Sequence, residues 1–395
     1  MKKVFVLVVL CVMACCCFSG VGICFADSEE ESLEQELETA TNEQLSSLDF
    51  DGLQDILDDM NASQKNVFGS TSFFDKVSRL LSGDFGDGFS SFFDAFINTF
   101  FEDVLGFVPL LCIVVIITIL CSVISSLRAE TAQKGVGEIV NFVCFGAVVV
   151  VISATVVGLF NEVRSSVSTM QTEMQILFPI LLTFLAAVGG TVSVGIYQPA
   201  VAILTQVVVV IFMFVIIPIF VFMFVLSIIN NFASNVRLNK MIDFCKSLLK
   251  WISTLSFGAF LGILGIQGIV AGSFDGVSVR AAKFALKSYV PILGGYLSDG
   301  FNVAVAGSVL IKNAVGVSGI FLLFASIFSP VLHLVTFLLL LKLTAAILEP
   351  ISNTTIPNFL HQTAKMLGLL VMIVLAISFM YIITIGLILC TANVL

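Results

Sequence analysis

Histidines and charged residues inside apolar stretches are the first candidates for chemistry in this sequence. The chain has two histidines, His333 and His361, and no HExxH motif, so a zinc protease or a Ser/His/Asp site is difficult to assemble. The glycines at 135–137 lack the preceding strand and the later glycine of a nucleotide-binding loop, and no Walker motif is present. We therefore expect no enzyme activity, no cofactor and no metal site.

Two polar features within apolar sequence are more informative. Lys342 lies deep in an apolar run, where a charge at the bilayer centre costs at least about 2.5–3.5 kcal/mol. It should face protein or water, or snorkel to the interface. His333 falls on the opposite flank of one continuous helix, so the two should pair only if Pro330 breaks that helix. The stretch 273–313 interleaves charges with glycines, which suits a water-facing cavity, a re-entrant turn or a partner surface.

Two groups of residues are therefore candidates for function. The glycines of one apolar helix fall within an arc of about 120°, which favours helix packing over a channel lining; they are Gly258, Gly262, Gly265, Gly268 and Gly272. The residues of a membrane pathway or partner surface are predicted to be Pro179, Gly189, Gly190, Arg280, Lys283, Pro291, Gly294, Asp299, Asn302, Lys312, Asn313 and Lys342.

Composition places these residues in a membrane protein. The 395 residues are 58% hydrophobic and 11% charged, with a mean hydropathy of +1.10, whereas soluble domains carry about 25% charged residues. Residues 27–104 hold 19 Asp/Glu and 3 Lys/Arg, a net charge of −16; residues 105–395 hold 13 Lys/Arg and 8 Asp/Glu, a net charge of +5. This segregation argues against nucleic acid and leaves the lipid bilayer as the expected surrounding.

The apolar segments predict an all-α polytopic membrane domain over 105–395. A bilayer core needs about 20 apolar residues per helix. Seven segments meet this need, and Pro330 would make eight by splitting one of them; they are 105–127, 139–160, 174–195, 200–229, 252–272, 313–348 and 366–390. We thus expect seven or eight transmembrane helices.

The N-terminal residues predict an exported region. Residues 1–26 read as a Sec signal peptide with Lys2 and Lys3 before an apolar run; an uncleaved anchor or a lipoprotein signal at Cys15 are the alternatives. Residues 27–104 would form a small, acidic, helical extracytoplasmic region. Its end, 88–104, has phenylalanines at helical spacing, which fits a helix at the membrane interface or the core face of a small domain.

Charge and span count disagree on topology. Alternation from an outside N-terminus puts 128–138 inside the cell but the basic segment 230–250 outside, against the positive-inside rule. A re-entrant segment would remove the conflict, and 174–195 is the first suspect. An inverted internal duplication would also ease it: an offset of 112 residues aligns Pro179 with Pro291 and predicts repeats 139–250 and 251–362. Chance matching of hydrophobic residues is the alternative.

Several stretches resemble the stage III sporulation protein AE family. They are GIQG at 265–268, DG at 275–276, RAAKF at 280–284, VPILG at 290–294, SVLIKNAVG at 308–316 and KLTAAILEP at 342–350. The likeness covers 105–390 and leaves 27–104 unmatched. It implies a mother-cell membrane protein around the forespore, in a transenvelope complex with other membrane proteins of the stage III sporulation A operon and with stage II sporulation protein Q.

Three functional interpretations follow. The chain is a permease-like or channel-like element of that complex, required for forespore development, or it is a structural scaffold that docks partners through glycine-faced helices. An unrelated solute transporter is the third. The resemblance supplies no catalytic residues, and it does not separate conduction from scaffolding.

Overall fold

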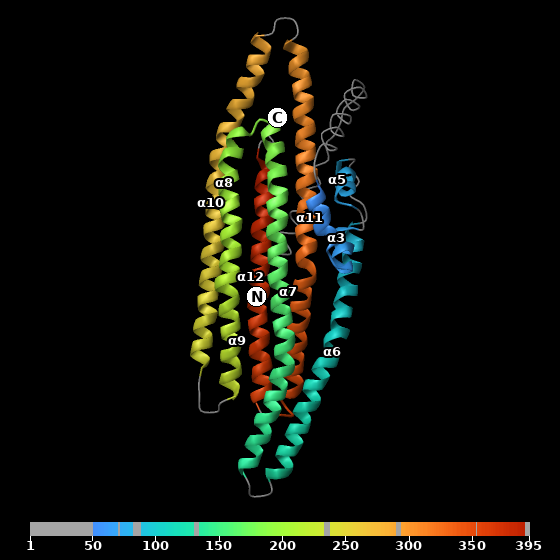
Figure 1. The fold of residues 1–395 in the computed structure, drawn as a ribbon, viewed down its shortest axis with the longest axis vertical. Coiled ribbons are helices and arrows are strands. Elements are labelled where there is room, and N and C mark those ends of the chain that lie inside the picture. The colour runs from blue at the N-terminus through green and yellow to red at the C-terminus, as the bar shows by residue number, and fades with distance from the viewer. Residues whose placement is uncertain are drawn as a thin grey trace.

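The computed structural model describes residues 50–69, 72–81, 88–129, 134–232, 238–289, 294–352 and 354–391. The predicted signal peptide at 1–26 and the acidic stretch up to residue 49 lie outside these residues. Within the described part, every regular element is a helix, and the helices run along one long axis (Figure 1). The predicted all-α fold class is confirmed.

Three short helices, α3 (Asp51–Asp58), α4 (Ala62–Phe68) and α5 (Phe73–Leu81), form a small unit on the side of the bundle, at the upper end of the helix labelled α6 in Figure 1. Helix α3 buries Leu53 and Leu57, one turn apart. The ring of Phe73 lies 6.1 Å from that of Phe68, and Lys76 Nζ sits 4.8 Å above the ring of Phe321. These contacts seat the unit on the long helix that carries Phe321.

The remaining helices are much longer than the first three. They are α6 (Gly88–Ala129), α7 (Lys134–Ala187), α8 (Thr191–Ile211), α9 (Ile217–Phe232), α10 (Asn239–Tyr289), α11 (Gly294–Leu348) and α12 (Thr355–Cys390). A π-helical turn, Phe212–Ile216, joins α8 to α9. It ends two residues before Pro218, whose ring would clash with the carbonyl four residues earlier in a regular helix.

Six helical stretches of the described chain are long and apolar enough to cross a membrane, close to the seven or eight expected. The predicted spans 139–160 and 174–195 differ from the structure because α7 runs unbroken from Lys134 to Ala187, through Pro179. Likewise α11 continues through Pro330, so 313–348 is one helix. Proline is tolerated in membrane helices because neighbouring groups satisfy the freed carbonyls.

Because α7 joins two predicted spans into one helix, the chain crosses the membrane one time fewer than expected before the basic segment 230–250. This removes the conflict between the span count and the positive-inside rule. Helices α6, α9 and α11 end, and α7, α10 and α12 begin, towards the lower end of the molecule in Figure 1. Arg128, Lys134 and Lys240 flank the connections α6–α7 and α9–α10. By the positive-inside rule this end is expected to face the cytoplasm. No re-entrant segment is needed, and 174–195 forms the end of α7, a turn and the start of α8.

Gly189 and Gly190 form the turn between α7 and α8, and the shape of this turn explains why glycine occupies these positions. Gly189 has φ 97°, a left-handed conformation that favours glycine. Its N–H donates to Ala186 O at 2.9 Å, and the N–H of Gly190 donates to Leu185 O at 2.8 Å. This is the hydrogen-bond pattern of a Schellman motif, so both glycines terminate a helix.

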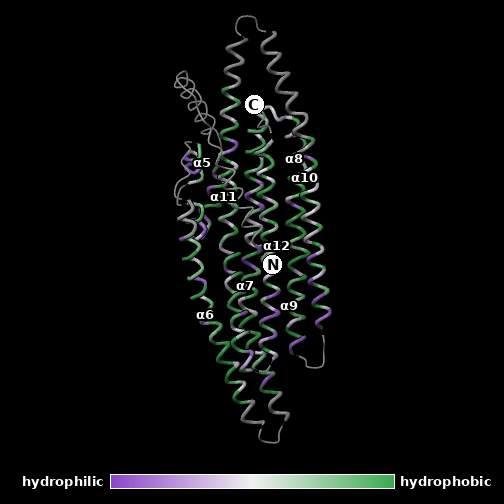
Figure 2. The backbone as a smooth tube through the Cα atoms, turned by 180° about the vertical axis from the view of Figure 1, so that it is seen from behind, coloured by the Kyte–Doolittle hydropathy of each residue, from purple (hydrophilic) through white to green (hydrophobic). Residues whose placement is uncertain are grey.

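Apolar residues cover much of the outer surface of the bundle, and hydrophobic colouring follows all the long helices (Figure 2). Leu105, Val150 and Phe214 are 72%, 70% and 76% exposed. Side chains of this kind would aggregate in water but are matched by lipid tails. Phe96 and Phe101 of the phenylalanine-rich segment belong to this surface, since they are 39% and 59% exposed, and 88–104 continues without a break into the first span as part of α6.

Candidate functional site: a polar seam between α7 and α11

A row of polar side chains lies between α7 and α11, and we call it the α7–α11 polar seam. On α7 it contains Glu162 and Glu173, eleven residues or about three turns apart and therefore on one face. On α11 it contains Ser326, Ser329 and His333, spaced three and four residues apart on one face. The two helices run in opposite directions, so Glu173 meets Ser326 and Glu162 meets His333.

Asp103 of α6 completes a triad at one end of the seam. His333 Nδ1 lies 2.6 Å from Glu162 Oε1, and His333 Nε2 lies 3.0 Å from Asp103 Oδ1. The side chains of His333, Glu162 and Asp103 are 26%, 32% and 9% exposed. Ser329 Oγ, 3.4 Å from His333 Nε2, is the nearest hydroxyl of the seam. The Asp103–His333–Glu162 triad thus links three helices.

The geometry of the triad implies its charge. Ionised carboxylates only accept hydrogen bonds, so a histidine bonded to a carboxylate at each ring nitrogen carries hydrogen on both, as imidazolium. With both carboxylates ionised, the triad then carries one net negative charge. Asp103 Oδ2 is also buried and has no hydrogen-bond partner among the described residues. The triad therefore has spare capacity to attract a cation or a hydrogen-bond donor.

An open groove of about 370 Å³ adjoins the triad. Two of its lining positions are glycines, Gly106 and Gly158, and a Cβ at either would meet nothing within 4 Å. These glycines keep space beside the charged groups. The full lining is Glu102, Asp103, Gly106, Phe107, Thr155, Gly158, Leu159, Glu162 and His333.

The other end of the seam is closed. Glu173 is 1% exposed, and its Oε1 accepts a short hydrogen bond from Ser326 Oγ. The backbone carbonyl of Ser326 accepts from Gln64 Nε2 of α4 at 3.0 Å. Gln64 also accepts from the N–H of Asn61 at 2.9 Å, which holds its amide in place at the start of α4. The α3–α5 unit thus contacts the seam residue that binds Glu173.

The predicted pathway residues are distributed over other parts of the bundle. Lys312 is fully buried in α11, and its Nζ donates to the carbonyls of Thr391 at 2.8 Å and Leu389 at 3.2 Å, at the end of α12. Lys342 is half-buried near the end of α11, from where its side chain can snorkel. It forms no ion pair with His333, whose partners are Asp103 and Glu162. Asn313 lies beside Lys312 in α11 with its Oδ1 buried.

Several predicted residues have no described side chain. Arg280 and Lys283 lie in α10, whereas Gly294, Asp299 and Asn302 lie in the first turns of α11. Pro291 and the side chains of this region, Gly272 included, fall outside the described part of the chain. Their role stays a prediction.

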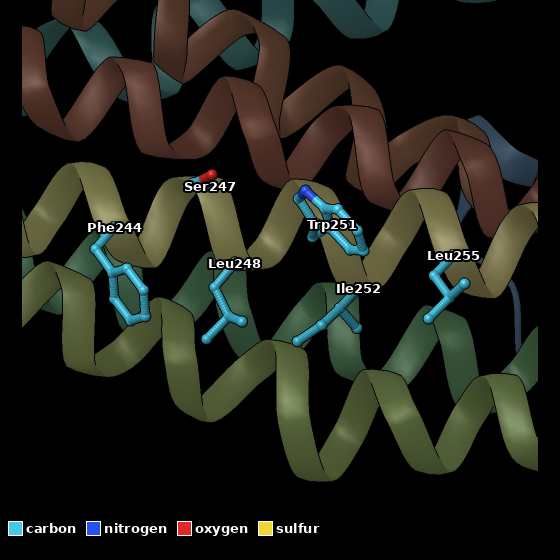
Figure 3. Close-up of a pocket in the computed structure, with 6 residues that line it drawn as sticks. All are labelled: Phe244, Ser247, Leu248, Trp251, Ile252 and Leu255. Atoms are coloured by element: carbon cyan, nitrogen blue, oxygen red, sulfur yellow. The ribbon is translucent and has the colours of Figure 1, made fainter.

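The glycine-faced helix is α10, and its glycines fall into two groups. A Cβ at Gly258, Gly262 or Gly265 would meet nothing within 4 Å, so these three face away from the chain's own helices. Gly268 instead lies against the Tyr197 hydroxyl, 3.3 Å from the Cβ position. An apolar groove of about 280 Å³ continues along α10, with Phe244, Trp251 and Leu255 projecting from it (Figure 3).

The seam does not emerge from the predicted spans, because its α7 residues lie between two of them. Glu162 and Glu173 fall between the predicted spans 139–160 and 174–195, outside every predicted membrane helix. Their spacing of about three helical turns was the available signal. His333 was singled out, but its partners come from helices far away in sequence.

Comparison with known proteins agrees with these features of a helical membrane protein. Residues 71–392 match the family described as stage III sporulation protein AE. The stage III sporulation protein AE of Bacillus subtilis (strain 168) is 22% identical over 317 residues, covering 80% of this chain and 79% of the relative. No solved structure matches the chain. This membrane protein belongs to the stage III sporulation protein AE family.

Proposed function

We propose that the chain is the permease-like membrane subunit of a transenvelope complex required for forespore development. The complex joins it to other membrane proteins of the stage III sporulation A operon and, across the intermembrane space, to stage II sporulation protein Q. The chain would act in the mother-cell membrane around the forespore, without catalysing a reaction. Membership of the sporulation family and the polar seam support this proposal.

The Asp103–His333–Glu162 triad beside its open groove is the observation that carries the permease-like part. Ionisable residues inside membrane segments are costly, and they are retained mainly on substrate or ion pathways. A buried ion pair contributes little net stability compared with apolar packing, so stability alone does not account for it. The groove gives a polar solute space beside these charges.

Charge-removing substitutions in the native host test this function. Asp103→Asn and His333→Gln should reduce spore formation to the level of a deletion strain, while the protein still accumulates and co-purifies with its partners. Asp243→Asn is the matched control, because this carboxylate is 73% exposed and pairs only with Lys246 in the described structure. Normal spore yields from both triad variants would refute a pathway at the triad.

The open glycine face of α10 favours scaffolding as a second candidate function. Small residues let a second helix approach closely in a membrane, and among the described residues a Cβ at Gly258, Gly262 or Gly265 would meet nothing within 4 Å. Replacing Gly262 and Gly265 together by leucine should abolish co-purification of partner membrane proteins. Gly146→Leu, also at an open helical position, should leave it intact. Intact complexes from the double variant would argue against docking at this face.

A further inference from the structure

Glu173 is buried without the partners that an ionised carboxylate needs. Its side chain is 1% exposed, Ser326 Oγ binds one oxygen, and Oε2 has no hydrogen-bond partner in the described residues. No lysine, arginine or histidine of the described chain lies within ion-pair distance of it. This contrasts with Glu162, on the same face of α7, which is bonded to His333.

The elements around Glu173 supply neutral groups only. Helix α11 contributes the Ser326 hydroxyl, α4 contributes the Gln64 amide, and α12 contributes Tyr381 within electrostatic range of the carboxyl group. The Tyr381 hydroxyl is fully buried and also has no hydrogen-bond partner among the described residues. Two unpaired polar groups in one buried region indicate a missing hydrogen or water.

The ionised form of the Glu173 side chain is less favourable in this environment than the neutral acid. An isolated ionised carboxylate in a low-dielectric interior costs so much that the group takes up a proton instead. A neutral carboxylic acid keeps an acceptor oxygen for Ser326 and gains an O–H donor on the other oxygen. Protonation at Oε2 therefore removes the buried charge and leaves Oε1 as the acceptor of the Ser326 hydroxyl.

We propose that Glu173 is a proton-binding site of the membrane domain, occupied at rest by one exchangeable proton. On release, the O–H bond of the acid breaks, water accepts the proton, and a carboxylate that accepts from Ser326 remains. The hydrogen bond from Gln64 to the Ser326 carbonyl places this site beside the α3–α5 unit. Occupancy by a proton follows from burial; its use in transport rests on the proposed permease-like function.

Carbodiimide labelling of the intact wild-type protein tests the site without a variant. Dicyclohexylcarbodiimide reacts with neutral carboxylic acids in apolar surroundings and adds across the acid O–H. Trypsin cleavage after Arg164 and Arg237 releases a fragment in which Glu173 is the sole carboxylic side chain. We expect the adduct on this fragment at neutral pH and its loss in alkali. An unlabelled fragment at neutral pH would overturn the proposal.

Infrared spectroscopy supplies a second, independent measurement. The C=O band of a neutral carboxylic acid should be present in the wild-type protein, shift in D2O, disappear in Glu173→Gln and persist in Glu162→Gln. A wild-type band that Glu173→Gln leaves unchanged, or one that does not shift in D2O, would contradict an exchangeable proton. Sporulation of the triad variants tests the permease-like function separately, so failure of one proposal is distinguishable from failure of the other.

Discussion

Glu162 Oε1 lies 2.6 Å from Nδ1 of His333, and this contact joins α7 to α11 inside a membrane domain. The two residues are 171 positions apart in the sequence. Their pairing fixes the register of the antiparallel helices, because a shift of one turn would separate the imidazole from both carboxylates. The same register places Glu173 against Ser326.

A side chain that fills the groove should block the proposed pathway without destabilising the fold. In Gly158→Leu the new side chain occupies the groove beside Glu162, although its Cβ meets nothing within 4 Å. Leucine is also a better helix former than glycine, by somewhat less than about 1 kcal/mol. We expect unchanged thermal stability in detergent but a strong loss of spore formation.

Gly146→Leu is the control for this substitution, since it lies on the same helix at an open position outside the groove. It should sporulate like the wild type. Normal spore numbers from Gly158→Leu would show that the groove is not used.

Lys312 should stabilise the protein more than Lys342 does. Its ammonium group supplies hydrogen bonds to Thr391 O and Leu389 O, at the negative end of the α12 dipole. Lys312→Met removes them and should lower the unfolding free energy by about 1.5–3 kcal/mol. Thermal unfolding of the purified protein in detergent measures this loss.

Lys342→Met is the comparison, because no hydrogen bond or ion pair of Lys342 occurs within the described structure. A stability change within about 0.5 kcal/mol is expected for such a position. Equal destabilisation by the two variants would show that the cap on α12 is not what Lys312 contributes.

The arrangement of the connections predicts the membrane topology. In a cysteine-free background, Gln133→Cys, Asn235→Cys and Asn353→Cys should be protected from a membrane-impermeant thiol reagent in intact cells. Ser288→Cys, near the opposite end of α10, should be labelled under the same conditions. Labelling of Asn235→Cys from outside would restore the conflict between charge and span count.

The sequence was sufficient to predict a membrane protein, because a water-soluble fold cannot bury so many long apolar segments. The number of spans was harder to predict because polarity in the middle of α7 looks like a loop. Glu162, Arg164 and Glu173 interrupt the hydropathy there, although the helix continues through them. A charged residue inside a bundle is neutralised by partners from other helices, and hydropathy along one segment does not contain that information.

The site was harder still to predict, because the residues that form it are not neighbours in sequence. Asp103, Glu162 and His333 come from three helices, and only their packing brings them together. Gly189 and Gly190 were proposed as pathway residues from their position in an apolar segment, but their conformation shows a helix terminus. The predicted duplication with an offset of 112 residues stays a prediction.

Helix α11 is much longer than the hydrocarbon layer of a bilayer is thick. Its 55 residues extend for about 80 Å, whereas the hydrocarbon layer measures about 30 Å. Together with α10 it rises above the neighbouring helices in Figure 1. A large part of α11 therefore extends beyond a single hydrocarbon layer, where water or another protein, and not lipid tails, must surround it.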